Sequence, residues 1–138
     1  MQTLIFKTQF LHAKKIQREI EVPAEFSLYD LASAVVAAYD FNFDHAFGFF
    51  RKITEHWDFR DTEKYELFAD LEDQGIEPVD AGSVKKTKVS RVWKDPKDQM
   101  LFLFDYGDEW AGLLRLKHLA KDNLALNIQI LFQQKAKA

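Results

Sequence analysis

The chain has 138 residues, the usual length of one domain with a single core. Its formal net charge of -3 argues against a surface that coats nucleic-acid phosphates everywhere, although a local basic patch is still allowed. There is no cysteine, which excludes a disulfide framework, a thiolate zinc site and a cysteine nucleophile. No run of about 18 apolar residues is present, so we expect no membrane span and a cytoplasmic protein.

Two strands are predicted at the start of the chain. Residues 3–11 favour a strand, and residues 16–22 alternate between apolar and polar, as in a half-buried strand. Arg18 breaks this alternation because period two places it on the apolar face. It either lies near the sheet edge with its charged head in water, or meets a carboxylate from elsewhere in the chain.

A helix follows these strands. Pro23 ends the second strand, and Ser27 with Asp30 three positions later is close to a capping box. Apolar residues then recur at helical spacing, which predicts a helix over residues 27–39.

The middle of the chain gives weaker signals. Residues 46–53 predict a third strand, Trp57 marks a short strand or turn, and residues 64–71 favour a short helix. Residues 74–83 have the composition of a linker that is too short to separate domains.

The last third predicts a hairpin and a final strand. Residues 95–98 form a turn before a strand over 100–106, Gly107-Asp108 suits a tight loop, and residues 110–119 return antiparallel. A last strand is predicted over 124–132, before a tail at 133–138 that frays.

The strand that begins at Leu101 is apolar on both faces and runs into three carboxylates. Such a strand is expected in a sheet covered on both sides. The carboxylates of Asp105, Asp108 and Glu109, closed by Trp110, are costly to desolvate unless a cation meets them. We therefore expect a single α+β domain over 1–132: a largely antiparallel sheet of about five or six strands, packed by the helix 27–39 and one or two shorter helices.

Three segments resemble the plasmid pRiA-type Orf-three-like family, small proteins of plasmids, insertion elements and bacterial or archaeal chromosomes. They are Ile16–Ala24 (IQREIEVPA), Asp44-His45 after the capped helix, and Phe104–Trp110 (FDYGDEW). The resemblance implies an α+β fold and little about chemistry, because the function of the family is unknown. The family usually has a second histidine where this chain has Phe47, so we expect no metal site built on its histidines, and no cofactor.

The first candidate site is a charge cluster of Arg18 with Asp105 or Asp108, beside Glu109 and Trp110. An arginine on an apolar face and a carboxylate at the end of an apolar strand each need a partner of opposite charge. The cluster is either a buried ion pair that fixes the register or a pocket for a small polar ligand.

Two further candidates remain. His45 with Asp44 and a signature carboxylate could form an acid/base pair, a weak metal site, or simply a hydrogen-bonded loop histidine. The basic run 85–97 could bind nucleic-acid phosphates with stacking on its tryptophan, or be a solvated face that balances the acidic stretch 55–80. Its candidate contacts are Lys85, Lys86, Lys88, Arg91, Trp93 and Lys94.

The function favoured by the sequence is a non-catalytic binding or adaptor module for a protein or a small polar ligand. One alternative is a nucleic-acid accessory protein of mobile elements that uses residues 85–97. The other is a small hydrolase or isomerase that uses His45 and Asp108.

Overall fold

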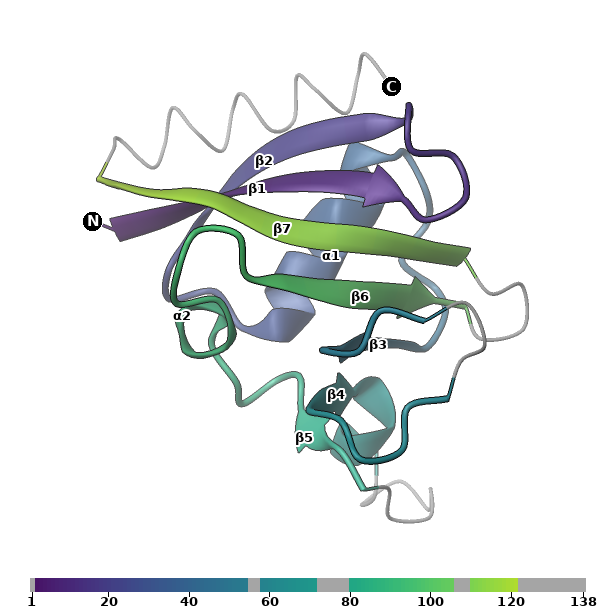
Figure 1. Cartoon of the computed structure of the whole chain (residues 1–138). Coiled ribbons are helices and arrows are strands. Elements are labelled where there is room, and N and C mark those ends of the chain that lie inside the picture. The colour runs from purple at the N-terminus through teal and green to yellow at the C-terminus, as the bar shows by residue number, and fades with distance from the viewer. Residues whose placement is uncertain (1, 55–57, 72–79, 106–109, 122–138) are drawn as a thin grey trace.

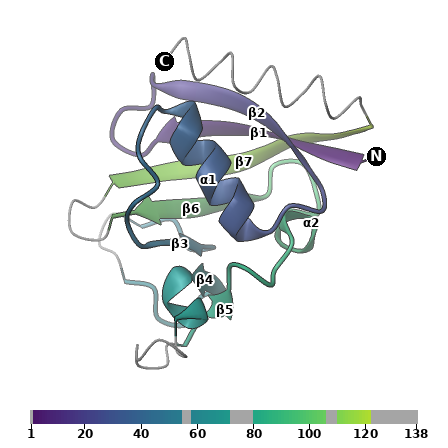
Figure 2. The same cartoon turned by 180° about the vertical axis from the view of Figure 1, so that it is seen from behind.

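The computed structural model describes residues 2–54, 58–71, 80–105 and 110–121. They form one seven-stranded sheet in the order β2-β1-β7-β6-β3-β4-β5, with helix α1 lying across one face (Figures 1 and 2). Neighbouring strands are antiparallel except β4 and β5, which are parallel. The strands are β1 (Gln2–Phe10), β2 (Gln17–Pro23), β3 (Phe47–Phe50), β4 (Lys64–Glu66), β5 (Gly82–Ser83), β6 (Gln99–Phe104) and β7 (Trp110–Lys121). The helices are α1 (Leu28–Ala38), the 3-10 turn η1 (Leu67–Asp70) and α2 (Val89–Val92).

The α+β class and the largely antiparallel sheet are confirmed, whereas the predicted strand number is too low. Strands β4 and β5 have three and two residues, too few for any alternation to show in the sequence. The short helix predicted over 64–71 is instead β4 followed by η1. The expectations for Trp57, the Gly107-Asp108 loop, the strand 124–132 and the tail 133–138 lie outside the described residues.

The helix and the apolar hairpin strand are present near their predicted positions, although β6 ends at Phe104 and does not continue through Asp105. Ser27 caps α1, its Oγ accepting a hydrogen bond from the backbone N–H of Asp30 at 3.1 Å. Strand β6 lies between β7 and β3 and is buried on both faces. Met100, Phe102 and Phe104 belong to the core shared with α1, and Leu101 and Leu103 to a smaller cluster on the other face. None of the described helices is long and apolar enough to cross a membrane.

Trp93 belongs to the core, which corrects its assignment to a nucleic-acid surface. Its side chain is 1% exposed and meets the edge of the Phe6 ring, with centroids 4.9 Å apart. Its indole Nε1 donates to the Leu114 carbonyl at 3.2 Å. An indole held on both its apolar and its polar side cannot stack on a base without unfolding the core.

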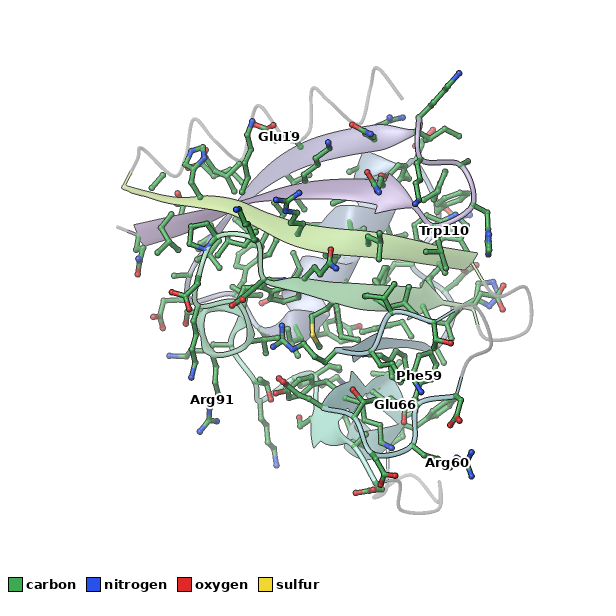
Figure 3. The ribbon with its side chains drawn as sticks, viewed as in Figure 1. Glu19, Phe59, Arg60, Glu66, Arg91 and Trp110 are labelled. Atoms are coloured by element: carbon green, nitrogen blue, oxygen red, sulfur yellow. The ribbon has the colours of Figure 1, made fainter. Side chains whose placement is uncertain are left out.

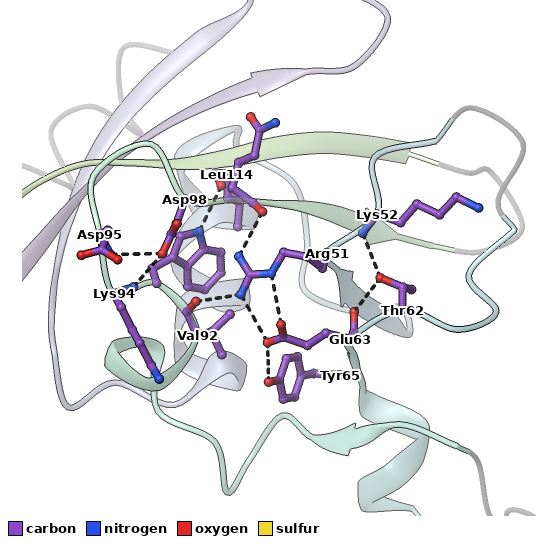
Figure 4. A network of polar contacts seen from close by, with 12 residues as sticks. Arg51, Lys52, Thr62, Glu63, Tyr65, Val92, Lys94, Asp95, Asp98 and Leu114 are labelled. Atoms are coloured by element: carbon purple, nitrogen blue, oxygen red, sulfur yellow. Dashed lines mark hydrogen bonds and ion pairs between the residues drawn. The ribbon is translucent and has the colours of Figure 1, made fainter.

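Arg51, directly after β3, joins four separate segments (Figure 4). Its Nε and Nη2 donate to the two carboxylate oxygens of Glu63 at 3.1 and 3.3 Å. The same guanidinium donates to the carbonyls of Val92 (2.8 Å) and Gln99 (3.3 Å). The Tyr65 hydroxyl donates to Glu63 at 2.7 Å. A planar cation with several donors thus fastens the short strand β4 to the rest of the sheet.

We expect the substitution Trp93→Phe to destabilise the fold by about 2 kcal/mol, because it removes a buried hydrogen bond and part of a filled core volume. The measurement is urea unfolding at neutral pH. Arg91→Gln, two residues away on the exposed side of α2, is the matched control and should stay within about 0.5 kcal/mol of the parent chain. Equal stabilities for the two variants would contradict a core role for Trp93.

The hydroxyl of Tyr65 should ionise at a higher pH than that of an ordinary tyrosine. Its burial, followed by its hydrogen bond to Glu63, raises the pKa of Tyr65 from 10.0 to about 12. The folded state therefore favours the neutral phenol, so this stabilisation is complete below pH 10 and is lost as the pH rises through about 12. An ultraviolet titration of phenolate formation, taken as the difference between the parent chain and Tyr65→Phe, measures the shift. A difference signal with its midpoint near pH 10 would contradict it.

Candidate functional site

A pocket of about 300 Å³ opens at the end of the sheet where β6 ends and β7 begins. Among the described residues its lining combines three aromatic rings with two carboxylates, one imidazole and one amide. These residues are Phe41, Asn42, Asp44, His45, Phe104, Asp105 and Trp110. Three predicted site residues, His45, Asp105 and Trp110, therefore meet in one pocket.

The pocket depends on how the chain leaves β6. Asp105 has φ 63°, a left-handed conformation that residues other than glycine seldom adopt. Its backbone N–H donates to the Ala46 carbonyl at 2.9 Å, one residue before β3 begins. Phe104 beside it is 4% exposed, whereas the Asp105 side chain is 19% exposed. The turn thus places a carboxylate at the pocket while keeping the preceding ring in the core.

The end of α1 supplies the opposite wall. The backbone N–H of Asp40 donates to Ala37 and that of Phe41 to Val36, the two hydrogen bonds of a Schellman motif. Asp40 takes φ 61° at the position where glycine usually stands. This helix ending directs the chain to the start of β7, where the rings of Phe41 and Trp110 meet edge to face with centroids 5.2 Å apart. The Phe41 side chain stays 42% exposed at the pocket.

His45 lies between two carboxylates. Its Nε2 is 3.3 Å from Asp44 Oδ1 and 3.4 Å from Asp105 Oδ2. Its ring meets Phe104 edge to face, with centroids 5.7 Å apart. About half of its side chain is exposed, so solvent and a ligand can both reach the imidazole. The structure therefore brings His45 together with Asp44 and with Asp105 of the signature.

Trp110 is held in place by other rings. It begins β7 (Figure 3) and meets Phe10 at 4.8 Å and Tyr39 at 5.6 Å between centroids, both edge to face. Phe10 and Tyr39 are themselves stacked, 4.7 Å apart. The Tyr39 hydroxyl shares a 2.6 Å hydrogen bond with Thr8, and burial raises the pKa of Tyr39. A tryptophan fixed on several sides presents its remaining surface without further loss of entropy on binding.

The structure does not bring Arg18 to Asp105. Arg18 lies opposite Thr8, Thr8 opposite Leu114, and Leu114 opposite Met100. Asp105 follows Met100 by five residues on the chain and is three strands away from Arg18. Strand spacing and rise per residue separate the two Cα atoms by roughly 20 Å. The predicted ion pair between them is therefore wrong, and its alternative partner Asp108, like Glu109, lies outside the described residues.

Arg18 instead contacts the C-terminal end of α1. It does share the face of β2 that packs on α1, as period two predicts, but its hydrogen-bond partners among the described residues are backbone carbonyls. Its Nε donates to the carbonyl of Ala38, the last residue of α1, at 3.2 Å, and its Nη1 donates to Gln17 at 2.8 Å. Its guanidinium lies 5.0 Å from the centre of the Tyr39 ring. A cation at a helix C-terminus is favoured by the helix dipole, and one near an aromatic ring by its quadrupole.

The basic run 85–97 does not form one uniform surface. Lys85 lies 5.2 Å from the centre of the Tyr29 ring, and Lys88 pairs with Glu25. The backbone N–H groups of Lys94 and Asp95 donate to the Asp98 carboxylate, which confirms the turn predicted at 95–98. Lys86 and Arg91 are exposed.

Three lining residues, Phe41, Asn42 and Phe104, were missed by sequence reasoning. Phe41 and Asn42 follow the helix, and Phe104 is the last residue of β6, a strand predicted as core, so neither pattern indicates a site. The recurrence of aromatics at 41 and 43 directly after a helix was the one available signal. Among the described residues, no group of three or more His, Asp or Glu side chains is arranged to hold a metal ion.

Comparisons with known proteins agree on the fold. A crystal structure of a protein of unknown function from Methanosarcina mazei Go1 matches with a TM-score of 0.65 and 21% sequence identity, over 88% of this chain. This chain covers 62% of that protein's length, and the likeness at this identity concerns the fold alone. No curated protein matches the chain. The family model of plasmid pRiA4b ORF-3-like proteins matches residues 7–137, nearly the whole chain, and the chain therefore belongs to this family.

Proposed function

We propose that the chain is a cytoplasmic, non-catalytic binding module whose pocket at His45, Asp105 and Trp110 takes a small polar group with a positive charge. The group can belong to a small molecule or to a side chain of a partner protein. The observation that supports this proposal is the meeting of carboxylates and aromatic rings in one pocket of about 300 Å³. That volume is at the small end of known ligand pockets.

The charge of the pocket selects the class of ligand. Asp44 and Asp105 contribute two negative charges, and no lysine or arginine is among the described lining residues. An anion would be repelled, and a purely apolar ligand would desolvate the carboxylates without replacing their hydrogen bonds. A cation gains from the carboxylates and from the aromatic faces together.

The pocket holds its polar groups before a ligand arrives. Asp105 is fixed by its backbone hydrogen bond to Ala46, and Trp110 by contacts with several rings. Little ordering is then needed on binding, so a modest number of contacts can give measurable affinity. No serine, threonine or tyrosine is among the described lining residues, so that lining offers no hydroxyl nucleophile.

Tetramethylammonium is the probe for this proposal, with uncharged 3,3-dimethylbutanol as its neutral counterpart of similar shape. We expect the cation to bind and to shift the backbone amide signals of residues 41–45 and 105 in ¹⁵N-correlation spectra. Asp105→Asn should weaken binding about tenfold, because one carboxylate charge is lost. Asparagine tolerates a positive φ, so the turn should survive this change.

Asp58→Asn is the matched control for Asp105→Asn. It removes the same charge from an exposed carboxylate that pairs with Arg60 and does not line the pocket. Its affinity for tetramethylammonium should equal that of the parent chain. Equal binding of the cation and the neutral alcohol, or an unchanged affinity in Asp105→Asn, would refute the proposal.

General acid/base catalysis is the second candidate, and one observation favours it. Both carboxylates lie near Nε2 of His45, which favours the neutral tautomer with its proton on Nε2. In that tautomer Nδ1 carries the lone pair and can accept a proton. This arrangement resembles the orientation of a catalytic histidine by an acid. Asp108, its predicted partner, lies outside the described residues.

Hydrolysis of para-nitrophenyl acetate separates the two candidates. The non-catalytic proposal expects a rate no greater than that of free imidazole at the same concentration, and no more than a small change in His45→Asn. A rate well above that of imidazole that disappears in His45→Asn, with tetramethylammonium as an inhibitor, would establish catalysis at this pocket instead.

A further inference from the structure

A second, oppositely charged hollow lies on the face of the sheet that α1 does not cover, the face seen in Figure 1. It has a volume of about 290 Å³ and is formed by β1, β7 and the turn before β6. Its lining residues are Lys7, Pro96, Lys97, Arg115, Leu116 and Lys117. We propose that this hollow binds the phosphate group of a phosphorylated small molecule.

The register of the sheet brings like charges together. Lys7 on β1 and Arg115 on β7 are directly opposite each other, and both side chains are exposed. Like charges at directly opposite positions destabilise a sheet. An anion bound between the two side chains would replace this repulsion with attraction on both sides.

Two carboxylates near the hollow, Glu19 on β2 and Asp98 in the turn, already have partners. Glu19 lies opposite Lys7 on the other side of β1, and its carboxylate pairs with Lys117 at 2.9 Å. The Asp98 carboxylate accepts hydrogen bonds from the backbone of its own turn, and these lower the pKa of Asp98. Among the residues that the structure describes, no carboxylate lies within ion-pair distance of the Lys7, Lys97 or Arg115 side chains. Of the four cations in the lining, only Lys117 therefore has a carboxylate partner among the described residues, in a chain whose net charge is -3.

The backbone conformation of Lys97 is an independent observation that supports a binding role for the hollow. Lys97 has φ 80°, a conformation that favours glycine, yet a lysine stands there. The turn is fixed on β7 because the N–H of Lys97 donates to the Leu116 carbonyl and the N–H of Leu116 donates to the Asp98 carbonyl, both at 2.9 Å. A strained residue that a sheet holds rigidly, with a cationic side chain at a hollow, indicates a role for that side chain.

The chemistry of the hollow favours phosphate over other anions. Arg115 offers a planar set of donors that matches two phosphate oxygens, and the lysines add point charges around them. The lining also includes the exposed Pro96, whose ring supplies apolar contact for the rest of a small molecule, whereas the Leu116 side chain is buried in the core. The site is distinct from the acidic pocket at Asp105, which would repel the same ligand.

The experiment titrates the full chain with sodium pyrophosphate at constant ionic strength and follows the backbone amides by ¹⁵N-correlation spectra. We expect saturable shifts at residues 7, 97 and 115. Arg115→Gln should weaken binding about tenfold, since a charge-assisted contact is lost. Lys97→Gly should also weaken binding while raising thermal stability, because glycine accepts the positive φ without strain.

The control is Lys86→Gln, which removes one exposed positive charge outside the hollow and should leave the affinity unchanged. Absence of saturable binding, or an equal loss of affinity in Lys86→Gln and Arg115→Gln, would overturn the proposal. Shifts at the same residues with oligothymidylate but none with pyrophosphate would also overturn it, in favour of a nucleic-acid backbone.

Discussion

One backbone hydrogen bond, from the N–H of Asp105 to the carbonyl of Ala46, determines the shape of the acidic pocket. It closes the end of β6 onto the segment that leads from α1 into β3. His45 and Asp44 lie on that segment, so the bond brings them to the Asp105 carboxylate. The left-handed backbone of Asp105 lets the strand end here, and the burial of Phe104 holds the turn in place. The bond extends the ladder between β3 and β6 by one step, and sequence-distant acids and the imidazole thereby share one cavity.

The fold was largely predictable because it follows from periodicity. The alternation in β2, the cap at Ser27 and the doubly apolar strand β6 each specify an element and the faces it buries. Strands β4 and β5 are held by partners rather than by their own pattern, so the sequence gives no sign of them. Their attachment depends on the contact of Arg51 with Glu63, a pair that no periodicity singles out.

The candidate site was predicted in part. Asp105 and Trp110 were identified because acids and aromatics adjoin an apolar strand, and His45 because it follows Asp44 in a segment that resembles the family. The three residues do meet in the pocket. The prediction that Arg18 pairs with Asp105 was wrong because pattern alone shows that a half-buried cation needs an acceptor without showing which kind. Here the acceptor is the carbonyl end of α1, together with the ring of Tyr39. Register between non-consecutive strands, which separates Arg18 from Asp105, cannot be obtained from a single sequence.

Strands β4 and β5 are short, and this favours local opening of the sheet at their edge. Three residue pairs join β4 to β3 and two join it to β5, whereas nine residues of β1 pair with β7. Local opening should therefore begin at the β5 edge and stop at β3, whose four residues are fully buried. The acidic pocket is formed by β6, β7 and the segment between α1 and β3, and the basic hollow by β1, β7 and the turn before β6, so both would keep their shape while β4 and β5 open locally.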